Sequence, residues 1–217
     1  MRDLSLKKIP LIRLLISSVE LYEQEEKLML VKVGAIRAAL DKSRLYCNEG
    51  VYVCIPWHGL QSVRNNSPKK AARYLNETPS RLDLPCREDL EKTSRRFNIK
   101  YLLAILNSSA ACNFLRANRR NNIQLYPDDW KKVPVPDIAP EQQASVVKLV
   151  DKILTAMNAD LMAQITPMEA EIDTRVAHLY QLAEEEYSLI LKELKLPDPF
   201  AEAALNFYRD IAGGILK

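Results

Sequence analysis

The feature that most constrains the fold is a regular apolar stripe in the last third of the chain. After Pro140, apolar side chains recur at alternating steps of three and four residues, at Val147, Val150, Leu154, Met157 and Leu161. This spacing places them on one face of a helix, which needs a partner to cover it. The stripe predicts a helix that starts at Pro140 and is broken by Pro167, packed either against the chain's own helices or against another molecule.

Three more helices are predicted after this break. One carries Ile172, Val176 and Leu179, one runs from Tyr187 to Leu194, and the last has Asp198 as its N-cap, Pro199 at its first position and Gly213-Gly214 at its end. An earlier helix is predicted from Asn98 as N-cap to residues 116–118, with Leu102, Leu103, Leu106, Ala110 and Phe114 on its apolar face.

Strands are predicted in the first sixty residues. Residues 28–33 are apolar and β-branched and stop at Gly34, while residues 46–55 alternate around Asn48-Glu49-Gly50, which is typical of a hairpin. Residues 57–96 predict long irregular segments, with a short helix at 69–75 as an alternative. Pro134 and Pro136 predict an extended backbone. The sequence thus predicts an α+β fold, with a mixed strand-and-loop domain over residues 1–138 and a helical region over residues 139–217.

Charge is divided unevenly along the chain. Residues 61–132 contain fifteen Lys and Arg against seven Asp and Glu, a net charge of +8, whereas residues 141–217 contain seven basic against thirteen acidic, a net charge of −6. A polyanion would be attracted by the middle of the chain and repelled by its tail.

Cysteine spacing and hydropathy narrow the class of protein further. The cysteines Cys47, Cys54, Cys86 and Cys112 form no CxxC pair, and with His58 and His178 they give no zinc site of usual spacing. We expect reduced and mostly buried thiols and two structural histidines. No apolar run approaches the roughly 20 residues of a membrane span, and the start of the chain lacks a signal-peptide pattern, so we expect a cytoplasmic protein.

Several sequence blocks, taken in order, carry a family resemblance. Tyr-Leu-Leu-Ala-Ile-Leu-Asn-Ser at 101–108, Lys-Val-Pro-Val-Pro at 132–136 and Glu-Gln-Gln at 141–143 lead into Leu-Val-Asp-Lys-Ile-Leu at 149–154. This succession resembles the TaqI-like C-terminal specificity domain. Residues 171–173, 179–180 and 184–186 are similar to the segment that closes many of those enzymes, although Gln181 stands where the family often has glycine. Residues 31–41 and 46–55 look like the family's early strands.

The resemblance implies a function. That family supplies the target-recognition domain of Type IIG restriction-modification enzymes and of related adenine-specific DNA methyltransferases. It therefore implies sequence-specific recognition of double-stranded DNA. The implied partner is a methyltransferase module, in the same chain or a separate one, with or without an endonuclease.

Catalytic motifs are missing from the chain. Its five glycines form no GxG loop, and no Asn-Pro-Pro-aromatic motif occurs. We expect no catalytic site and no cofactor here, with S-adenosylmethionine bound by the associated module. The chain is then a separate specificity subunit or a part of a longer enzyme. A helical protein-interaction or scaffold module without DNA binding is the alternative, and an enzyme with an unrecognised site is a further one.

Candidate DNA contacts lie between residues 64 and 132. Base contacts are predicted first in the 116–124 segment, because Arg pairs with guanine and Asn or Gln with adenine. Its candidates are Arg116, Asn118, Arg119, Arg120, Asn121, Asn122 and Gln124. The alternative is a basic helix end that complements the helix dipole.

Phosphate contacts are predicted for a second set of basic side chains. These are Arg64, Lys69, Lys70 and Arg73, with Arg95 and Arg96 behind them, and the alternative is a solvated charged face. Asn65 could read an adenine or form a turn. Trp57 is predicted to be a core residue or a loop anchor, whereas Trp130 could stack on an extruded base, wedge into the duplex or have such a structural role. The Asp129-x-Lys131 triplet could hold a nuclease metal, but Asp129 is predicted to cap a turn instead.

Overall fold

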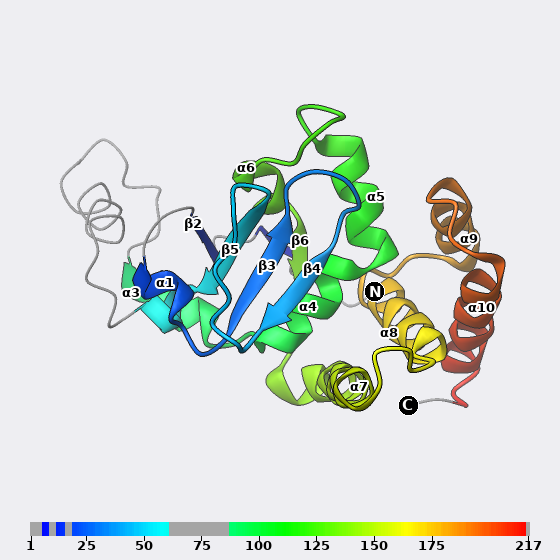
Figure 1. Ribbon diagram of the computed structural model, residues 1–217. Helices are drawn as coiled ribbons and strands as arrows, with labels where there is room; N and C mark the ends of the chain where they lie inside the picture. The colour runs from blue at the N-terminus through cyan, green and yellow to red at the C-terminus, as the bar shows by residue number, and fades with distance from the viewer. Residues whose placement is uncertain (1–5, 9–11, 16–18, 61–86, 216–217) are drawn as a thin grey trace. The chain divides into compact units, whose positions relative to one another are not determined.

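The computed structural model describes residues 6–8, 12–15, 19–60 and 87–215 (Figure 1). The chain divides into two compact units. The sheet unit consists of residues 8–99 and 120–132, and the helical unit consists of residues 1–7, 100–119 and 133–217. The possible helix at 69–75 lies outside the described residues, as do Arg64, Asn65, Lys69, Lys70, Arg73 and Cys86.

The sheet unit is built on a four-stranded antiparallel sheet with the strand order β2-β5-β3-β4 (Figure 1). The strands are β2 (Ile12–Leu15), β3 (Lys27–Val31), β4 (Ala38–Asp41) and β5 (Val51–Pro56). The helices of this unit are α1 (Val19–Tyr22), the 3₁₀ helix η1 (Trp57–Leu60), α3 (Arg87–Ser94) and α6 (Pro127–Trp130). Strand β5 is central because it pairs with both β2 and β3.

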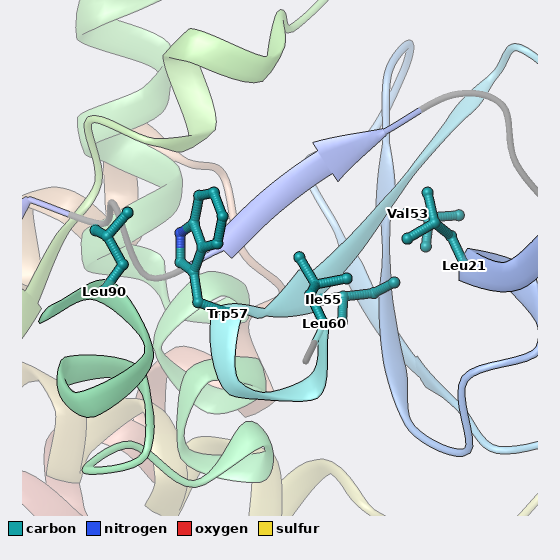
Figure 2. Packing of buried hydrophobic residues seen from close by; sticks show 6 residues of the cluster. All are labelled: Leu21, Val53, Ile55, Trp57, Leu60 and Leu90. Atoms are coloured by element: carbon teal, nitrogen blue, oxygen red, sulfur yellow. The ribbon is translucent and has the colours of Figure 1, made fainter. Parts of the chain in front are cut away.

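One apolar cluster packs α1, η1 and α3 against the sheet (Figure 2). Val53 and Ile55 on β5 lie on one face, since residues two apart on a strand point the same way. Leu21, Leu60 and Leu90 join them, together with Trp57. Trp57 is 9% exposed, so its prediction as a core residue is confirmed.

Strands β3 and β4 also bury an ion pair. Lys27 and Asp41 lie opposite each other in the register, and the Lys27 ammonium contacts the Asp41 carboxylate with neither side chain accessible to solvent by more than 3%. Lys27 Nζ also donates to the Tyr22 carbonyl at 2.8 Å. Burial alone would raise the pKa of Asp41, but hydrogen bonds from Lys27 and from the backbone N–H groups of Ser43 and Leu45 lower it. This carboxylate is held in its charged form.

The helical unit contains the remaining elements. Its helices are α4 (Ile99–Asn107), α5 (Ser109–Asn118), α7 (Pro140–Ala159), α8 (Thr166–Leu179), α9 (Glu184–Glu193) and α10 (Asp198–Ala212). A two-stranded pair joins β1 (Leu6–Lys8) to β6 (Pro134–Pro136). Helices α8 and α10 pack side by side (Figure 1) through a cluster that includes Ala170, Ala177, Ala204 and Tyr208. The small alanine side chains allow the two helix backbones to approach closely.

A buried carboxylate ties three helices of this unit together. Asp173 on α8 accepts hydrogen bonds from the backbone N–H of Ser109 at 2.6 Å and from the Ser109 hydroxyl at 2.7 Å, at the start of α5. Tyr187 on α9 donates its hydroxyl to the same carboxylate at 2.7 Å. Burial raises the pKa of Asp173, and the hydrogen bonds from Ser109 and Tyr187 oppose this effect only in part.

The fold is α+β, as predicted, and several elements agree closely. The helix from Pro140, the helix around Ile172, the extended Pro134–Pro136 and the strand that stops before Gly34 are all present. The last helix begins after Pro197 as its N-cap, so Asp198 stands inside its first turn and not at the cap.

Four predictions of secondary structure were wrong. The hairpin at 46–55 is absent, because the residues before the turn form no strand and β5 pairs with β3 and β2 instead. The helix after Asn98 is two helices, separated at Ser108, which caps α5 by accepting from the Ala111 N–H. Helix α3 lies in a region predicted to be irregular. Helix α7 ends at Ala159 and is not broken by Pro167, which lies in the first turn of α8, so Leu161 is outside the helix and 79% exposed.

The compact units do not coincide with the predicted ranges 1–138 and 139–217. Helices α4 and α5 fall within the first range, but residues 100–119 belong to the helical unit because α5 packs against α8 and α9. The functional division into a recognition part and a scaffold part stays a prediction.

Candidate nucleic-acid interface

The 116–124 segment ends α5 and continues into the loop before α6. The boundary between the units falls between Arg119 and Arg120, so the segment belongs to both units and each half is described by itself. In the sheet unit, the loop is joined to the end of β3. The Leu125 N–H donates to the Lys32 carbonyl at 2.8 Å, and Val33 forms an antiparallel bridge with Gln124. These backbone contacts fix where the loop leaves the sheet unit.

Two amide side chains of the segment shape the loop from within. The Asn121 side-chain oxygen accepts from the Ile123 N–H at 2.6 Å and from the Gln124 N–H at 3.1 Å, which is an Asx-type turn. The Gln124 side chain donates to the Tyr126 hydroxyl. Asn121 and Gln124 therefore stabilise the conformation of the loop. The side-chain groups that make these hydrogen bonds are not free to bind a base at the same time.

Arg120 is held by contacts within the sheet unit. Its guanidinium donates to Asp128 at 2.8 Å, lies 3.9 Å from the buried Asp129 carboxylate and is 5.9 Å from the centre of the Tyr126 ring. Lys131 also donates to Asp128, at 3.2 Å. Hydrogen bonds from Lys131 and Arg120 lower the pKa of the Asp128 carboxyl. Since Arg120 and Asp128 are both about half exposed, their pair is a weak one that a phosphate could replace.

The helical unit carries the other half of the segment. Arg116 is exposed in the last turn of α5, and the Asn118 side chain donates to the Phe114 carbonyl at 2.8 Å. The Arg119 backbone N–H donates to the Leu115 carbonyl, while its side-chain Nε is buried with no hydrogen-bond partner among the described residues. The Arg119 backbone and the Asn118 side chain therefore also serve to end the helix, while the dipole alternative for the arginine charges stays a prediction.

Two side chains at the outer part of the loop face solvent. Asn122 is exposed, and its side chain makes no hydrogen bond within the described part of the chain. Ile123 is 75% exposed. The sequence pattern included Asn122 among several equivalent amides of the segment but missed Ile123, because exposure of an apolar residue in a loop has no signature in sequence.

Trp130 and Asp129 belong to the core of the sheet unit. Trp130 is 2% exposed and Asp129 is 1% exposed. The Asp129 carboxylate accepts from the Tyr126 N–H at 2.9 Å at the start of α6, so its prediction as a cap is confirmed. Trp130 anchors this short helix, and its ring is not available for stacking on a base in this structure. Among the described residues, no group of His, Cys, Asp and Glu side chains could hold a metal ion.

Arg95 and Arg96 follow the end of α3 and are both exposed. His58 lies close by, with its Nδ1 2.9 Å from the Ser94 hydroxyl. Burial lowers the pKa of His58, and the charge of Arg95 lowers it further. His58 therefore has a structural role, as expected. Arg95 and Arg96 add two exposed cations to the sheet unit.

The described cysteines are all unpaired. Cys54 is buried, and burial raises the pKa of its thiol well above the ordinary value, while Cys47 and Cys112 are partly buried. A buried thiol such as that of Cys54 is a poor nucleophile. Cys112 shows the same direction of pKa shift for the same reason.

Comparison with models of protein families, with curated proteins and with solved structures found no match in any of the three. Within the described residues, the structure also has no helix that is both long and apolar enough to cross a membrane.

Proposed function

We propose that this chain recognises specific sequences in double-stranded DNA, as the specificity domain of a restriction-modification methyltransferase, and has no catalytic site of its own. The observation that carries the proposal is the loop after α5, where exposed Asn122 follows Arg120 by two residues and lies within the Asx-type turn closed by the Asn121 side chain. A base-reading side chain needs such a fixed support, because a loose one loses discrimination. The family resemblance of the sequence blocks around this loop points the same way.

Some of the proposed contacts position the chain on the DNA backbone, and others read the base sequence. Arg116, Arg120 and Lys131 are exposed cations that suit phosphate groups, which set the register of a protein on DNA. Asn122 suits an adenine edge, to which an amide can make two hydrogen bonds. Arg95 and Arg96 supply a second basic site in the sheet unit.

The charge of the helical tail suits contact with a partner module better than contact with DNA. Residues 141–217 have a net charge of −6, which opposes contact with DNA and leaves these helices for a partner module. Leu161 and Met162, in the turn between α7 and α8, are 79% and 81% exposed and are apolar enough for such a contact. The partner is the methyltransferase, which binds S-adenosylmethionine.

Selection from a pool of random duplexes tests the proposal. The chain should enrich one sequence motif. Asn122→Ala should weaken binding of that motif by about 1–3 kcal/mol at one adenine position while leaving the salt dependence of binding unchanged. An equal loss of affinity on every sequence, or no enriched motif, would count against sequence reading by this loop.

A matched variant completes this experiment. Asn158→Ala alters an exposed amide in the last turns of α7 and should bind as the unmodified chain does. The double variant Lys69→Ala and Lys70→Ala, from the sequence prediction, should flatten the salt dependence without changing the motif.

A further inference from the structure

Ile123 is an apolar side chain exposed in the middle of a polar loop. At 75% exposure, it is more open than Val33, which lies opposite Gln124 and is 53% exposed. A single exposed apolar residue is ordinary on a protein surface and needs no explanation by itself. The surroundings of Ile123 are what make it unusual.

The backbone at Ile123 is fixed on both sides. The Ile123 N–H itself donates to the Asn121 side chain, and the next two residues are held by the same side chain and by β3. Isoleucine is β-branched and has few rotamers, so the side chain adds little freedom of its own. A stiff apolar group on a stiff loop loses little conformational entropy when it enters another surface.

The chain segments on either side of the bridge between Val33 and Gln124 are rich in cations. Residues 32–37 and 120–132 of the sheet unit together contain five Lys and Arg and two Asp. Asp128, one of these two, already accepts from Arg120 and Lys131, and Asp129 is buried. The excess of positive over negative charge favours a polyanion over an apolar protein surface as the partner that binds this loop.

We propose that Ile123 is a wedge that inserts between two stacked base pairs when the loop binds duplex DNA. The inference rests on the proposed function and extends it from reading base edges to deforming the helix. Proteins that enter the minor groove combine Arg and Asn side chains with an apolar wedge of this kind, and Arg120 and Asn122 lie within three residues of Ile123. The wedge makes binding sensitive to how easily a base step opens.

The test uses the full chain and two short duplexes that differ only by one central mismatch. Since a mismatch removes part of the unstacking cost of a few kcal/mol, the unmodified chain should bind the mismatched duplex at least about tenfold more tightly. Ile123→Ala should bind the two duplexes alike, and Ile123→Val should keep part of the preference. Val33→Ala is the matched control and should keep all of it.

The outcomes separate the wedge from the proposed function. If the unmodified chain binds both duplexes equally in a salt-dependent manner, and Ile123→Ala does the same, the wedge is wrong while DNA binding stands. If neither duplex is bound, the proposed function fails together with the wedge. If replacing thymine by uracil lowers affinity only when Ile123 is present, the side chain contacts thymine methyl groups and the wedge is overturned.

Discussion

The sheet unit and the helical unit each bury one carboxylate, and they satisfy it in different ways. Asp41 in the sheet unit contacts the fully buried ammonium of Lys27 and two backbone N–H groups. Asp173 in the helical unit receives hydrogen bonds from Ser109 and Tyr187, which are uncharged. The pKa of Asp41 is therefore lowered, while the pKa of Asp173 is raised.

The difference predicts how strongly the stability of each unit responds to a change at its buried carboxylate. A charge buried beside its counter-ion is costly to disturb, since removal of one partner leaves the other unpaired. A carboxylate among neutral donors can take up a proton with less loss. The sheet unit, which carries most of the candidate DNA contacts, is thus sensitive to charge changes in its interior, and the helical unit is less so.

The largest effect is expected for Lys27→Met. The substitution leaves Asp41 charged and buried without its counter-ion, so the free energy of unfolding should fall by about 3–5 kcal/mol in urea denaturation. The double variant Lys27→Met and Asp41→Leu should recover most of this loss. A single variant as stable as the unmodified chain would remove the contrast between the two units.

A smaller loss is expected for Asp173→Ala. It leaves the buried N–H and hydroxyl of Ser109 without their acceptor, and it leaves the Tyr187 hydroxyl with only the longer contact to the Thr174 hydroxyl at 3.4 Å. The free energy of unfolding should fall by about 1–3 kcal/mol. Asp173→Asn keeps an acceptor oxygen and should cost less. If Asp173→Ala lowers the free energy of unfolding more than Lys27→Met does, the helical unit is the more sensitive of the two, contrary to this account.

The pH dependence sharpens the comparison, because the two carboxylates act with opposite sign. A lowered folded-state pKa means that the contribution of Asp41 is present above its unfolded pKa of about 3.9 and is lost as the pH falls below it. A raised folded-state pKa means that Asp173 favours folding at low pH and does so less as the pH rises above about 3.9.

Unfolding free energies measured from pH 3 to 7 check both signs. Relative to the unmodified chain, Asp41→Asn should flatten the loss of stability at low pH, and Asp173→Asn should flatten the decline toward neutral pH. Identical plots of unfolding free energy against pH for the two variants would contradict opposite pKa shifts of Asp41 and Asp173.

The smallest effect concerns the surface of the sheet unit. Asp128→Asn removes the negative charge that pairs with Arg120 and Lys131, and it replaces one of the two acceptor oxygens by an amide NH₂ group. Since exposed ion pairs contribute about 0–1 kcal/mol, stability should change little, while affinity for a mixed-sequence duplex should rise by a few fold at low salt. The matched variant in the helical unit, Asp160→Asn, should leave affinity unchanged. A fall in affinity for Asp128→Asn would show that Arg120 must be held by Asp128 to bind.

The sequence predicted the elements whose signals are local. The periodicity after Pro140 and the prolines at 134 and 136 locate α7 and β6, because a helix or strand with such a pattern needs no distant partner to be recognised. The start of α5 is held by Asp173, which is distant in the sequence and accepts from the Ser109 N–H, whereas the Ser108 cap that separates α4 from α5 is a local contact. The absent hairpin depends on the pairing of β5 with β2 and β3. Neither of the two distant contacts can be read from one sequence.

The candidate site shows the same limit. Composition identified the 116–124 segment, but it could not separate Asn121, which shapes the loop, from Asn122, which faces solvent. Nor could it show that Trp130 is buried or that Asp128 accepts from Arg120. Those roles follow from the backbone path around the loop, which the composition of the segment does not fix.

Contact between the 116–124 segment and DNA can be measured through the salt dependence of binding to a mixed-sequence duplex. The double variant Arg116→Ala and Arg120→Ala should weaken binding and make the slope of log K against log salt shallower by about 2, because each lost phosphate contact contributes about 0.9. Lys148→Ala with Lys192→Ala, which removes two exposed cations from α7 and α9, should leave the slope as it is. Equal slopes for both double variants would contradict contact between the 116–124 segment and DNA.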